Sequence, residues 1–354
     1  MGKLGKALLI FGIIALVGAI AFGCTVAAFG VTNGDWGVRI GGVDIDPRYI
    51  GIIHIPSFGN PIIKFRDGQT NISFDYENNK EYDFEYNAQD INKIVLGSSI
   101  GKNTVSCVPG GNTVSVRYTT GTRPVSFTSV YDNGVLTIDE KTSGFSWFGS
   151  GTAPTLLLSV PDVLYDALEL NQASGSTEIN SVRTQDLRVS VASGKADVKA
   201  EAGTIGLSLA SGSATITNTG DRIADSIEVN TASGKAEING FKANRSDFQL
   251  ASGSIIATGI SGKVSGQVMS GKLSIAYSEW NSDLELQIAS GSADITLPSG
   301  SGLDLDLERL SGSMSVSLDG HEEKFTKNVE TIIGGSNVND VEVNIASGSV
   351  RIHN

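Results

Sequence analysis

Apolar and polar residues alternate one by one in short segments throughout the C-terminal half of the chain, and a Ser-Gly pair interrupts each segment. Alternation with a period of two predicts β-strands and not helices. Successive pairs are 18 to 22 residues apart, except for a last interval of 36 residues, which indicates a repeat array. The nine pairs are Ser174-Gly175, Ser193-Gly194, Ser211-Gly212, Ser233-Gly234, Ser252-Gly253, Ser270-Gly271, Ser290-Gly291, Ser311-Gly312 and Ser347-Gly348.

The positions around each glycine are filled in the same way from repeat to repeat. Four residues after the glycine stands Ile or Val in eight of the nine repeats, and Ala257 is the exception. We interpret the unit as strand, bend, strand and turn, with glycine needed at the bend for close backbone approach or a positive φ. Stacked edge to edge, such units predict an all-β, single-stranded β-solenoid with apolar ladders inside, because no unit can bury a core alone.

The residue after the glycine alternates between Lys and Ser through the middle repeats. Lys195, Lys235 and Lys272 are separated by repeats that carry Ser213 and Ser254 at this position. Like charges directly opposite each other on neighbouring strands destabilise a sheet. The alternation therefore predicts an outer ladder in which the lysines are kept apart.

Residues 7–31 form an uncharged, mostly apolar stretch of 25 residues that follows Lys3 and Lys6. As a helix the stretch would extend about 37 Å, enough for a hydrocarbon core of about 30 Å. The two lysines predict a cytoplasmic N-terminus, with the rest of the chain outside the membrane. A signal peptide cleaved after Ala19-Ile20-Ala21 and a lipoprotein modified at Cys24 are the alternatives.

Residues 32–90 lack the repeat, and we expect them to form a juxtamembrane segment before a solenoid domain at 91–354. Aromatic residues alternate with acidic or polar ones at 72–76 and again at 82–86. The two stretches predict a hairpin with one aromatic and one acidic face. We expect the aromatic face either to cap the end of the solenoid or to form a surface for a cation or a partner.

Two other segments depart from the array. The aromatic-rich loop 143–152 is expected to pack on the solenoid or to contact a sugar or a partner. Residues 319–335 lengthen the last interval and are expected to form an irregular coil or a lid. The chain ends two residues after Ile352, so a final strand around Val350 could remain unpaired and allow self-association.

The chain is acidic, with a formal net charge of −12 over 354 residues. An acidic surface argues against nucleic-acid binding, which needs a basic face. Cys24 lies in the apolar stretch, so Cys107 has no partner for a disulfide framework. The role of Cys107 is left open.

The sequence offers few candidates for catalysis. Asp304, Asp306 and Glu308 alternate with leucines, so all three are expected to face outward on one strand, with Asp294 on the adjoining strand. Two such acids would suffice for a glycoside hydrolase or lyase, but an acidic surface ladder is the better explanation. His321 lacks the second histidine of a zinc-protease helix. We therefore assign no catalytic, cofactor-binding or metal-binding residue.

The apolar stretch, the phrase Leu158-Ser159-Val160-Pro161, the recurring Ser-Gly pairs and the ending at 343–352 together resemble one bacterial group. It is the β-strand-repeat family of unknown function whose members are often called "putative adhesins" and include LiaG-like envelope-stress proteins. The resemblance covers residues 91–354. It implies a right-handed, extracytoplasmic β-helix behind one membrane helix, and it implies no established activity and no catalytic residues.

These observations predict a non-enzymatic binding, adhesin-like or scaffolding protein of the bacterial cell envelope, with a possible link to envelope stress. The expected partners are the lipid bilayer through residues 7–31 and a cell-wall glycan or an envelope protein, together with possible self-association and no nucleic acid. A carbohydrate-active β-helix enzyme that uses surface carboxylates is the alternative.

Overall fold

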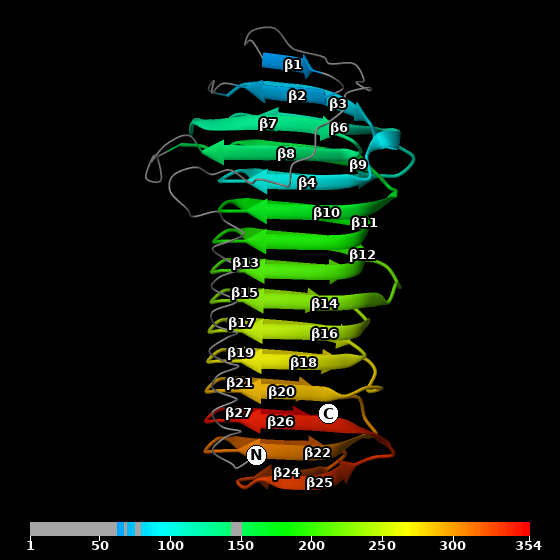
Figure 1. Cartoon of the computed structure of the whole chain (residues 1–354), viewed down its shortest axis with the longest axis vertical. Coiled ribbons are helices and arrows are strands. Elements are labelled where there is room, and N and C mark those ends of the chain that lie inside the picture. The colour runs from blue at the N-terminus through cyan, green and yellow to red at the C-terminus, as the bar shows by residue number, and fades with distance from the viewer. Residues whose placement is uncertain (1–61, 67–68, 75–78, 143–150) are drawn as a thin grey trace. The chain divides into compact units, whose positions relative to one another are not determined.

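The computed structural model describes residues 62–66, 69–74, 79–142 and 151–354 (Figure 1). The described residues belong to two compact units, which we call the lead unit, up to Ala202, and the repeat unit, from Gly203 onward. The division falls inside one long strand, β12 (Lys195–Leu209). Each unit is built from β-strands, so the predicted all-β solenoid class is confirmed.

The lead unit contains eleven strands before β12 and one short 3-10 helix, η1 (Ala88–Asp90), among its described residues. The strands are β1 (Ile62–Arg66), β2 (Gln69–Phe74), β3 (Glu81–Asn87), β4 (Lys93–Ser98), β5 (Lys102–Val108), β6 (Thr113–Thr119), β7 (Val125–Asp132), β8 (Val135–Thr142), β9 (Thr155–Pro161), β10 (Leu164–Gln172) and β11 (Ser176–Val191).

These strands form two walls. One wall has the order β1-β2-β7-β8-β4-β10-β11, and the other has the order β3-β6-β9-β5-β11. Strand β11 belongs to both, because its first residues pair with β5 and eight of its last nine residues pair with β10. The change of wall occurs at Ser181, whose φ of 58° is a conformation that turns the chain sharply.

The predicted hairpin at 72–86 is wrong. Strand β2 pairs with β1 and β7, whereas β3 pairs with β6 in the other wall. The aromatic residues of β3 face the interior instead of a hairpin partner: Phe84 is buried, and its ring lies 6.0 Å from that of Phe127 on the opposite wall. The acidic residues Glu81 and Glu85 are exposed. The aromatic face therefore serves as core, and the acidic face serves as surface.

The repeat unit continues from β12 with fifteen further strands. They are β13 (Ser213–Asn218), β14 (Ala224–Thr231), β15 (Lys235–Asn239), β16 (Ala243–Leu250), β17 (Ser254–Ile260), β18 (Lys263–Val268), β19 (Lys272–Tyr277), β20 (Leu284–Ile288), β21 (Ser292–Thr296), β22 (Ser301–Arg309), β23 (Ser313–Leu318), β24 (His321–Phe325), β25 (Val329–Gly334), β26 (Asn337–Ile345) and β27 (Ser349–His353).

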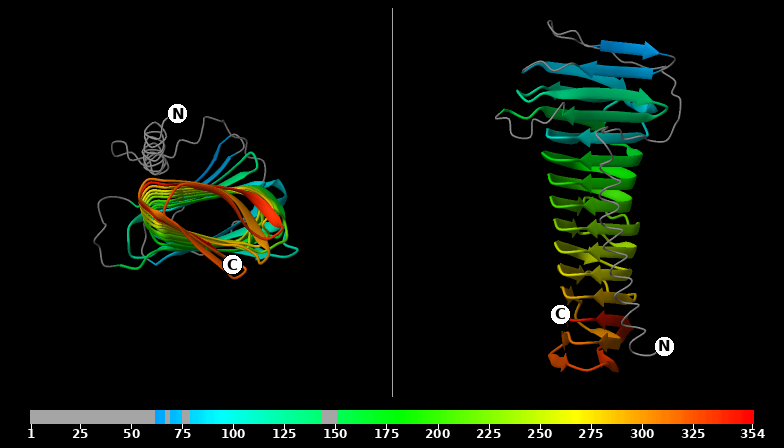
Figure 2. Two further views of the ribbon diagram at one scale, coloured as in Figure 1. Left: turned by 90° about the horizontal axis from the view of Figure 1, so that it is seen from below. Right: turned by 60° about the vertical axis from the view of Figure 1, so that its left-hand side comes forward.

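The repeat unit also has two walls, made almost entirely of parallel strands. One has the order β12-β14-β16-β18-β20-β26-β22-β25, and the other has the order β13-β15-β17-β19-β21-β27-β23-β24. Viewed end-on, the strands of this unit superimpose as a flattened coil with two long sides (Figure 2). Each coil therefore contributes one strand to each wall.

The last coil does not lie at the end of this stack. Strands β26 and β27, drawn in red in Figure 1, lie between the coil of β20 and β21 and the coil of β22 and β23. The expectation that the strand around Val350 stays unpaired is wrong, because β27 pairs with β21 on one side and β23 on the other. The segment 319–335 is neither an irregular coil nor a lid. It forms β24 and β25, which pair antiparallel with β23 and β22.

Apolar ladders fill the space between the two walls, as the sequence predicts. Ile216 and Ile238 are register partners with no exposed surface. Ala257, the exception in its column, lies between Ile238 and Ile275 and is also fully buried. A small residue is tolerated in this column because large neighbours stand on both sides.

The Ser-Gly bends stack at one edge of the coils. The amide of Lys235 donates to the carbonyl oxygen of Gly212 at 3.1 Å, and the amide of Ser254 donates to that of Gly234 at 2.9 Å. A Cβ on Gly234 would lie far inside van der Waals contact of the Gly212 carbonyl oxygen, while its φ is not in the positive range. The sequence left open whether the bend needs glycine for a positive φ or for close backbone approach. At Gly234 the reason is the close approach of the two backbones.

The lead unit contains a bend that the Ser-Gly pattern does not reveal. Ser99, Ile100 and Gly101 join β4 to β5, and the carbonyl oxygen of Gly101 accepts a bond from the Ser176 amide at 3.0 Å. No bend carbonyl receives the amides of Ile100 and Gly101. Instead, both donate at 2.9 Å to Oε1 of the buried Glu140, which also accepts from the Ser99 hydroxyl. A side-chain carboxylate thus replaces a backbone carbonyl at this bend.

The predicted membrane segment at residues 7–31 and the aromatic part of the loop 143–152 lie outside the described residues. Within the part of the chain that the structure describes, no helix has the length and apolar character needed to cross a membrane. The handedness of the coil stays a prediction.

We expect Gly234→Val to destabilise the repeat unit much more than Lys235→Ser. The valine side chain would collide with Gly212 and Leu209, and a loss of about 3 kcal/mol is typical of such overpacking. Lys235 is exposed and stands in a column that accepts serine, so its replacement should change stability by less than about 0.5 kcal/mol. Urea denaturation followed by circular dichroism measures both, and equal losses would contradict the assignment of the bend.

We expect Glu140 to make the stability of the lead unit depend on pH. Burial raises the pKa of Glu140 above its ordinary value of 4.5, although the bend amides and Ser99 oppose the shift. The folded state then binds a proton at higher pH than the unfolded chain, so stability falls as pH rises from about 4.5 through the folded pKa. The measurement is the free energy of unfolding between pH 4 and 7.

Glu140→Gln keeps an oxygen for the bend and should remove that pH dependence. Glu140→Ala should cost about 2 kcal/mol or more at every pH, because buried amides lose their acceptor. An unchanged pH profile in Glu140→Gln would show that Glu140 is not the group responsible.

Candidate functional site: a serine-lined groove

The repeat unit carries a groove of about 470 Å³ along its stacked bends, lined only by serine and glycine. The groove is shallow and open to solvent over most of its surface. The groove spans four bends, in the spatial order Gly271, Gly291, Gly348 and Gly312. At about 4.8 Å per coil this is a length of about 14 Å. The lining consists of Ser270, Gly271, Ser290, Gly291, Ser292, Ser311, Gly312, Ser313, Ser347, Gly348 and Ser349.

Two kinds of serine line the groove. The serines of the bends donate their hydroxyl hydrogen to the preceding coil: Ser290 to the Met269 carbonyl at 3.1 Å, and Ser347 to the Ala289 carbonyl at 3.2 Å. These hydroxyls keep their acceptor lone pairs for another molecule. Their first role is structural, because each one ties its bend to the next coil.

The serines that follow the glycines form the second row. Ser292, Ser349 and Ser313 are consecutive register partners, and their hydroxyls make no hydrogen bond to any described residue. In the coils that come earlier in the sequence, the same row contains Lys235 and Lys272 with Ser254 between them, so the predicted alternation of Lys and Ser is confirmed there. The alternation stops at Lys272, and the inserted last coil adds Ser349 to make three serines in a row.

Hydroxyl groups both donate and accept hydrogen bonds, so this groove suits a neutral, hydroxyl-rich ligand. It has no titratable lining residue and no aromatic platform. General acid–base chemistry requires an ionisable group within hydrogen-bond reach of the substrate. Among the described residues, the groove itself therefore offers binding contacts and no catalytic group.

The carboxylates singled out in the sequence do not converge. Asp304 and Asp306 are exposed on the outer face of β22, and the leucines between them are buried, as predicted. Asp294 is not on an adjoining strand. It belongs to β21 in the opposite wall, where its carboxylate oxygens lie 3.2 Å from Nε2 of His353 and 3.8 Å from Nζ of Lys272. The error arises because consecutive strands of a coil go to different walls.

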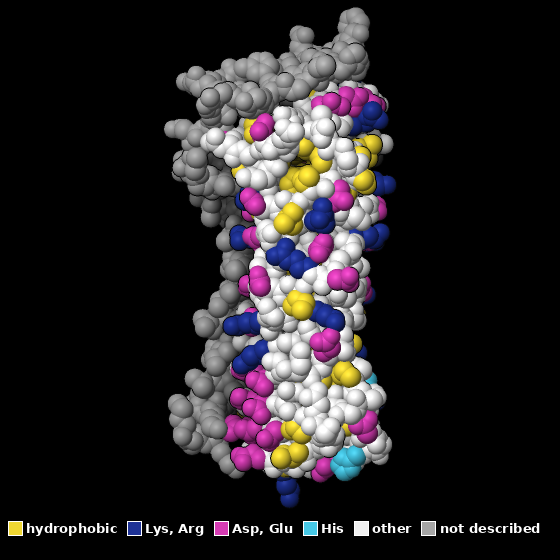
Figure 3. All heavy atoms as spheres, turned by 90° about the vertical axis from the view of Figure 1, so that its right-hand side faces the viewer, with side chains coloured by type: hydrophobic (Ala, Val, Ile, Leu, Met, Phe, Trp, Pro, Cys, Tyr) yellow, Lys and Arg dark blue, Asp and Glu magenta, His cyan; other side chains and the backbone are white. Residues whose placement is uncertain are grey.

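The insertion of the last coil instead builds an acidic row on the outer face. Glu285, Glu342, Asp306 and Glu330 are successive register partners on β20, β26, β22 and β25. Figure 3 shows acidic side chains concentrated toward this end of the repeat unit. Nevertheless, no group of three or more His, Cys, Asp or Glu side chains within the described residues is arranged to hold a metal ion. The row is therefore a negatively charged surface, with Arg245 on β16 interacting electrostatically with Glu285.

A polar cluster on the other wall was not found from the sequence. His353 on β27 lies between Asp294 on β21 and Ser317 on β23, which is its register partner. The residue types suggest a hydrolytic triad, but Nε2 of His353 is already within hydrogen-bonding distance of Asp294 and Thr296, and no hydrogen bond joins it to Ser317. The cluster holds the C-terminal strand in place, and only the inserted coil brings its members together.

Cys107 is half-buried on β5 of the lead unit and forms no disulfide. Burial raises the pKa of its thiol, and the neighbouring Asp162 carboxylate raises it further. A raised pKa disfavours the reactive thiolate at neutral pH. Cys107 is therefore a poor nucleophile in this structure.

A family model described as Toastrack DUF4097 matches residues 91–353, about three quarters of the chain. The chain belongs to this family. The resemblance drawn from the Ser-Gly repeats is thereby confirmed. A family assignment places the fold and leaves the activity to be argued from the surfaces described above. None of the curated proteins matches this chain.

The solved structures to which this chain is similar share little sequence with it. A "putative adhesin" from Parabacteroides distasonis is 15% identical, with 77% of this chain and 97% of that chain covered and a TM-score of 0.49. A "putative lipid binding protein" from the same organism is 15% identical, with 78% and 98% covered and a TM-score of 0.45. A "putative adhesin" from Bacteroides fragilis is 10% identical, with 77% and 97% covered and a TM-score of 0.36.

We expect Glu342→Gln to stabilise the repeat unit at low salt. The change removes one charge from the middle of the acidic row and keeps an oxygen to accept from Asn344, which donates to Glu342 at 2.9 Å. Relief of like-charge contacts should gain roughly 0.2–1 kcal/mol. Salt at 1 M, where the Debye length is about 3 Å, should abolish the gain.

Glu228→Gln is the matched control. Glu228 also accepts from an asparagine two residues on, but its acidic neighbour Asp247 is paired with Arg245. Urea midpoints at two salt concentrations compare the variants. A gain of equal size at Glu228, or one that persists at high salt, would contradict the electrostatic explanation.

Proposed function

We propose that this protein is a non-enzymatic binding protein of the bacterial cell envelope, in which the serine-lined groove binds a neutral, hydroxyl-rich polymer such as a cell-wall glycan. The observation that carries the proposal is the uninterrupted row of Ser292, Ser349 and Ser313 beside four stacked bends. A polymer whose units repeat along its length would meet equivalent hydroxyls at each coil. Many weak contacts of this kind add up when one ligand engages several of them.

Residues 7–31 complete the proposal as a membrane anchor. With Lys3 and Lys6 on the cytoplasmic side, the two β units would stand outside the membrane, where a glycan layer is present. The net charge of −12 supports a surface that repels acidic polymers. A neutral ligand in an uncharged groove is compatible with that charge. A role in envelope stress would follow from such binding.

A carbohydrate-active enzyme is less well supported. Glycoside hydrolysis needs two carboxylates on either side of one bond. Asp304 and Asp306 are exposed on the outer face of one wall, and Asp294 lies on the other wall. No observation on the described residues favours this second function.

Binding of the full chain in detergent to insoluble peptidoglycan and to neutral β-linked glucans tests the proposal. We expect Ser349→Lys to weaken the binding about tenfold or more, which equals about 1.4 kcal/mol. Lysine is compatible with this row, since Lys235 and Lys272 stand in it. Its side chain would cross the centre of the groove.

Ser274→Lys is the matched control, because Ser274 is on the same wall, outside the groove and in register with Asp294. It should bind like the parent chain. Equal affinity of the parent and Ser349→Lys, or no binding to any of these polymers, would contradict the groove as the binding site.

A further inference from the structure

The C-terminal coil occupies a place that its position in the sequence does not predict. Every other coil of the repeat unit follows the previous one in chain order, whereas β26 and β27 enter between two coils that are neighbours in sequence. Residues 337–354 are thus held by parallel pairing on both sides, in both walls. We call the space that they fill the slot.

The slot is defined by repeated columns. Val341 lies between Leu284 and Leu305 in one wall, and Ile352 lies between Ile295 and Val316 in the other. All of these side chains are buried. The contacts that hold the segment are made to residues 280–297 and 301–319, and any segment with the same sequence would satisfy them equally well.

The covalent connection to the segment is short and rich in glycine. Only Gly335 and Ser336 separate β25 from β26, and Gly334 has a φ of 87°. Gly335 passes so close to Gly300 that a Cβ on it would collide with the Gly300 carbonyl oxygen. A short, tightly bent connection next to a segment with extensive pairing is the arrangement in which identical elements exchange between chains.

We propose that residues 337–354 exchange between two copies of this chain, so that the segment of each copy fills the slot of the other. The closed and exchanged forms share all four strand pairings and differ only at residues 334–336. Their balance then depends on the bend and on protein concentration. Self-association would thus use strands that are paired on both sides, and not a free edge.

Exchange also has a consequence for the groove. Ser347, Gly348 and Ser349 form the third of its four bends, between the bends of Gly291 and Gly312. In the exchanged form this bend comes from the partner copy, and each groove contains residues of two chains. The exchange itself does not depend on what the groove binds.

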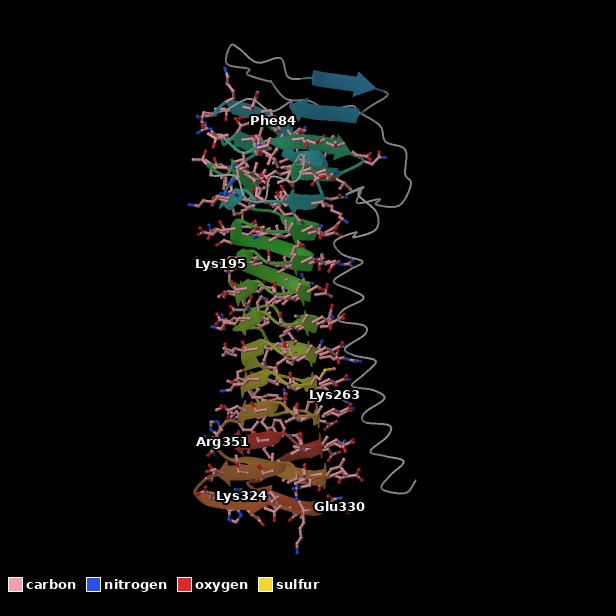
Figure 4. All side chains as sticks on the ribbon, turned by 90° about the vertical axis from the view of Figure 1, so that its left-hand side faces the viewer. Phe84, Lys195, Lys263, Lys324, Glu330 and Arg351 are labelled. Carbon is pink, nitrogen blue, oxygen red and sulfur yellow. The ribbon has the colours of Figure 1, made fainter. Side chains whose placement is uncertain are left out.

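Single-cysteine copies of the full chain, each with Cys24→Ser and Cys107→Ser, test the proposal in detergent. One copy carries Ser315→Cys and the other carries Arg351→Cys. These positions are register partners on β23 and β27, at a spacing of about 4.8 Å that a disulfide can bridge. Arg351 points outward from the inserted coil (Figure 4), so both thiols face solvent and lie outside the groove. The two copies are mixed at high concentration, incubated in mild denaturant, returned to native conditions and oxidised.

The proposal predicts a covalent dimer between the Ser315→Cys and Arg351→Cys copies, because that bond forms only when the segment of one copy lies in the slot of the other. Gly335→Ala in both copies should raise the yield several-fold, since the added methyl disfavours the closed bend. The control pair, Ser315→Cys with Lys263→Cys, should give no dimer above background, because Lys263 is on β18 of the other wall.

One chain that carries both Ser315→Cys and Arg351→Cys calibrates the experiment. If it forms its internal disulfide while the mixed single-cysteine copies do not dimerise, the exchange is refuted. If even the double variant forms no internal disulfide, the register of the inserted coil is wrong and the proposal falls with it. Binding to glycans can be present or absent in either case, so this result is separate from that of the groove.

Discussion

The stack of glycine bends is the constraint on which the rest of the repeat unit depends. At the bend of Gly234 and at every later bend, the amide that follows the glycine donates to the carbonyl oxygen of the glycine in the adjacent coil. This approach leaves no room for a side chain, as Gly253, Gly271 and Gly291 illustrate. It fixes the rise and register of the coils, and thereby places every apolar residue of a column over the same residue of the next coil. The ladders of the interior and the rows of the surface both follow from it.

The two units differ in how their last bends and strands are satisfied by hydrogen bonds. In the lead unit, the amide that follows Gly101 donates to the carbonyl oxygen of Pro154, while the amides of Ile100 and Gly101 donate to the buried carboxylate of Glu140. In the repeat unit, β24 and β25 fold back antiparallel over the last parallel strands. Glu330 and Lys324 stand on these closing strands (Figure 4). Charged residues on an edge strand oppose pairing with other sheets.

Much of the fold could be predicted from the sequence, because a bend that needs glycine and a column that needs an apolar residue both leave visible periodic signals. Columns such as Ile216 over Ile238 were found in this way. The bend at Gly101 was missed because isoleucine precedes its glycine, although Val105 stands four residues later and pairs with Ile179. A search for the glycine and the later valine, without the serine, could have found it.

Other features could not be predicted because they depend on which wall a strand joins and on the order in which coils stack. Local alternation made β2 and β3 look like a hairpin, but it carries no information about their walls. The insertion of β26 and β27 leaves the periodic signal unchanged, since Val343 would fit its column at either place. Consequently, three features could not be predicted from the sequence: the bend that Gly348 contributes to the groove, the acidic row, and the cluster of His353 and Asp294. Each of these is made by residues that the insertion brings together.

The account rests on the bend hydrogen bonds, and amide hydrogen exchange at single-residue resolution measures them directly. The amides of Lys235, Ser254, Lys272 and Ser292 lie at the surface, yet we predict that they exchange as slowly as amides in the middle of the strands. The amides of Ser349 and Ser313 should be protected in the same way, since they donate to Gly291 and Gly348. Exchange of these amides at the rate of an unfolded peptide, while the strands stay protected, would contradict the stacked bends.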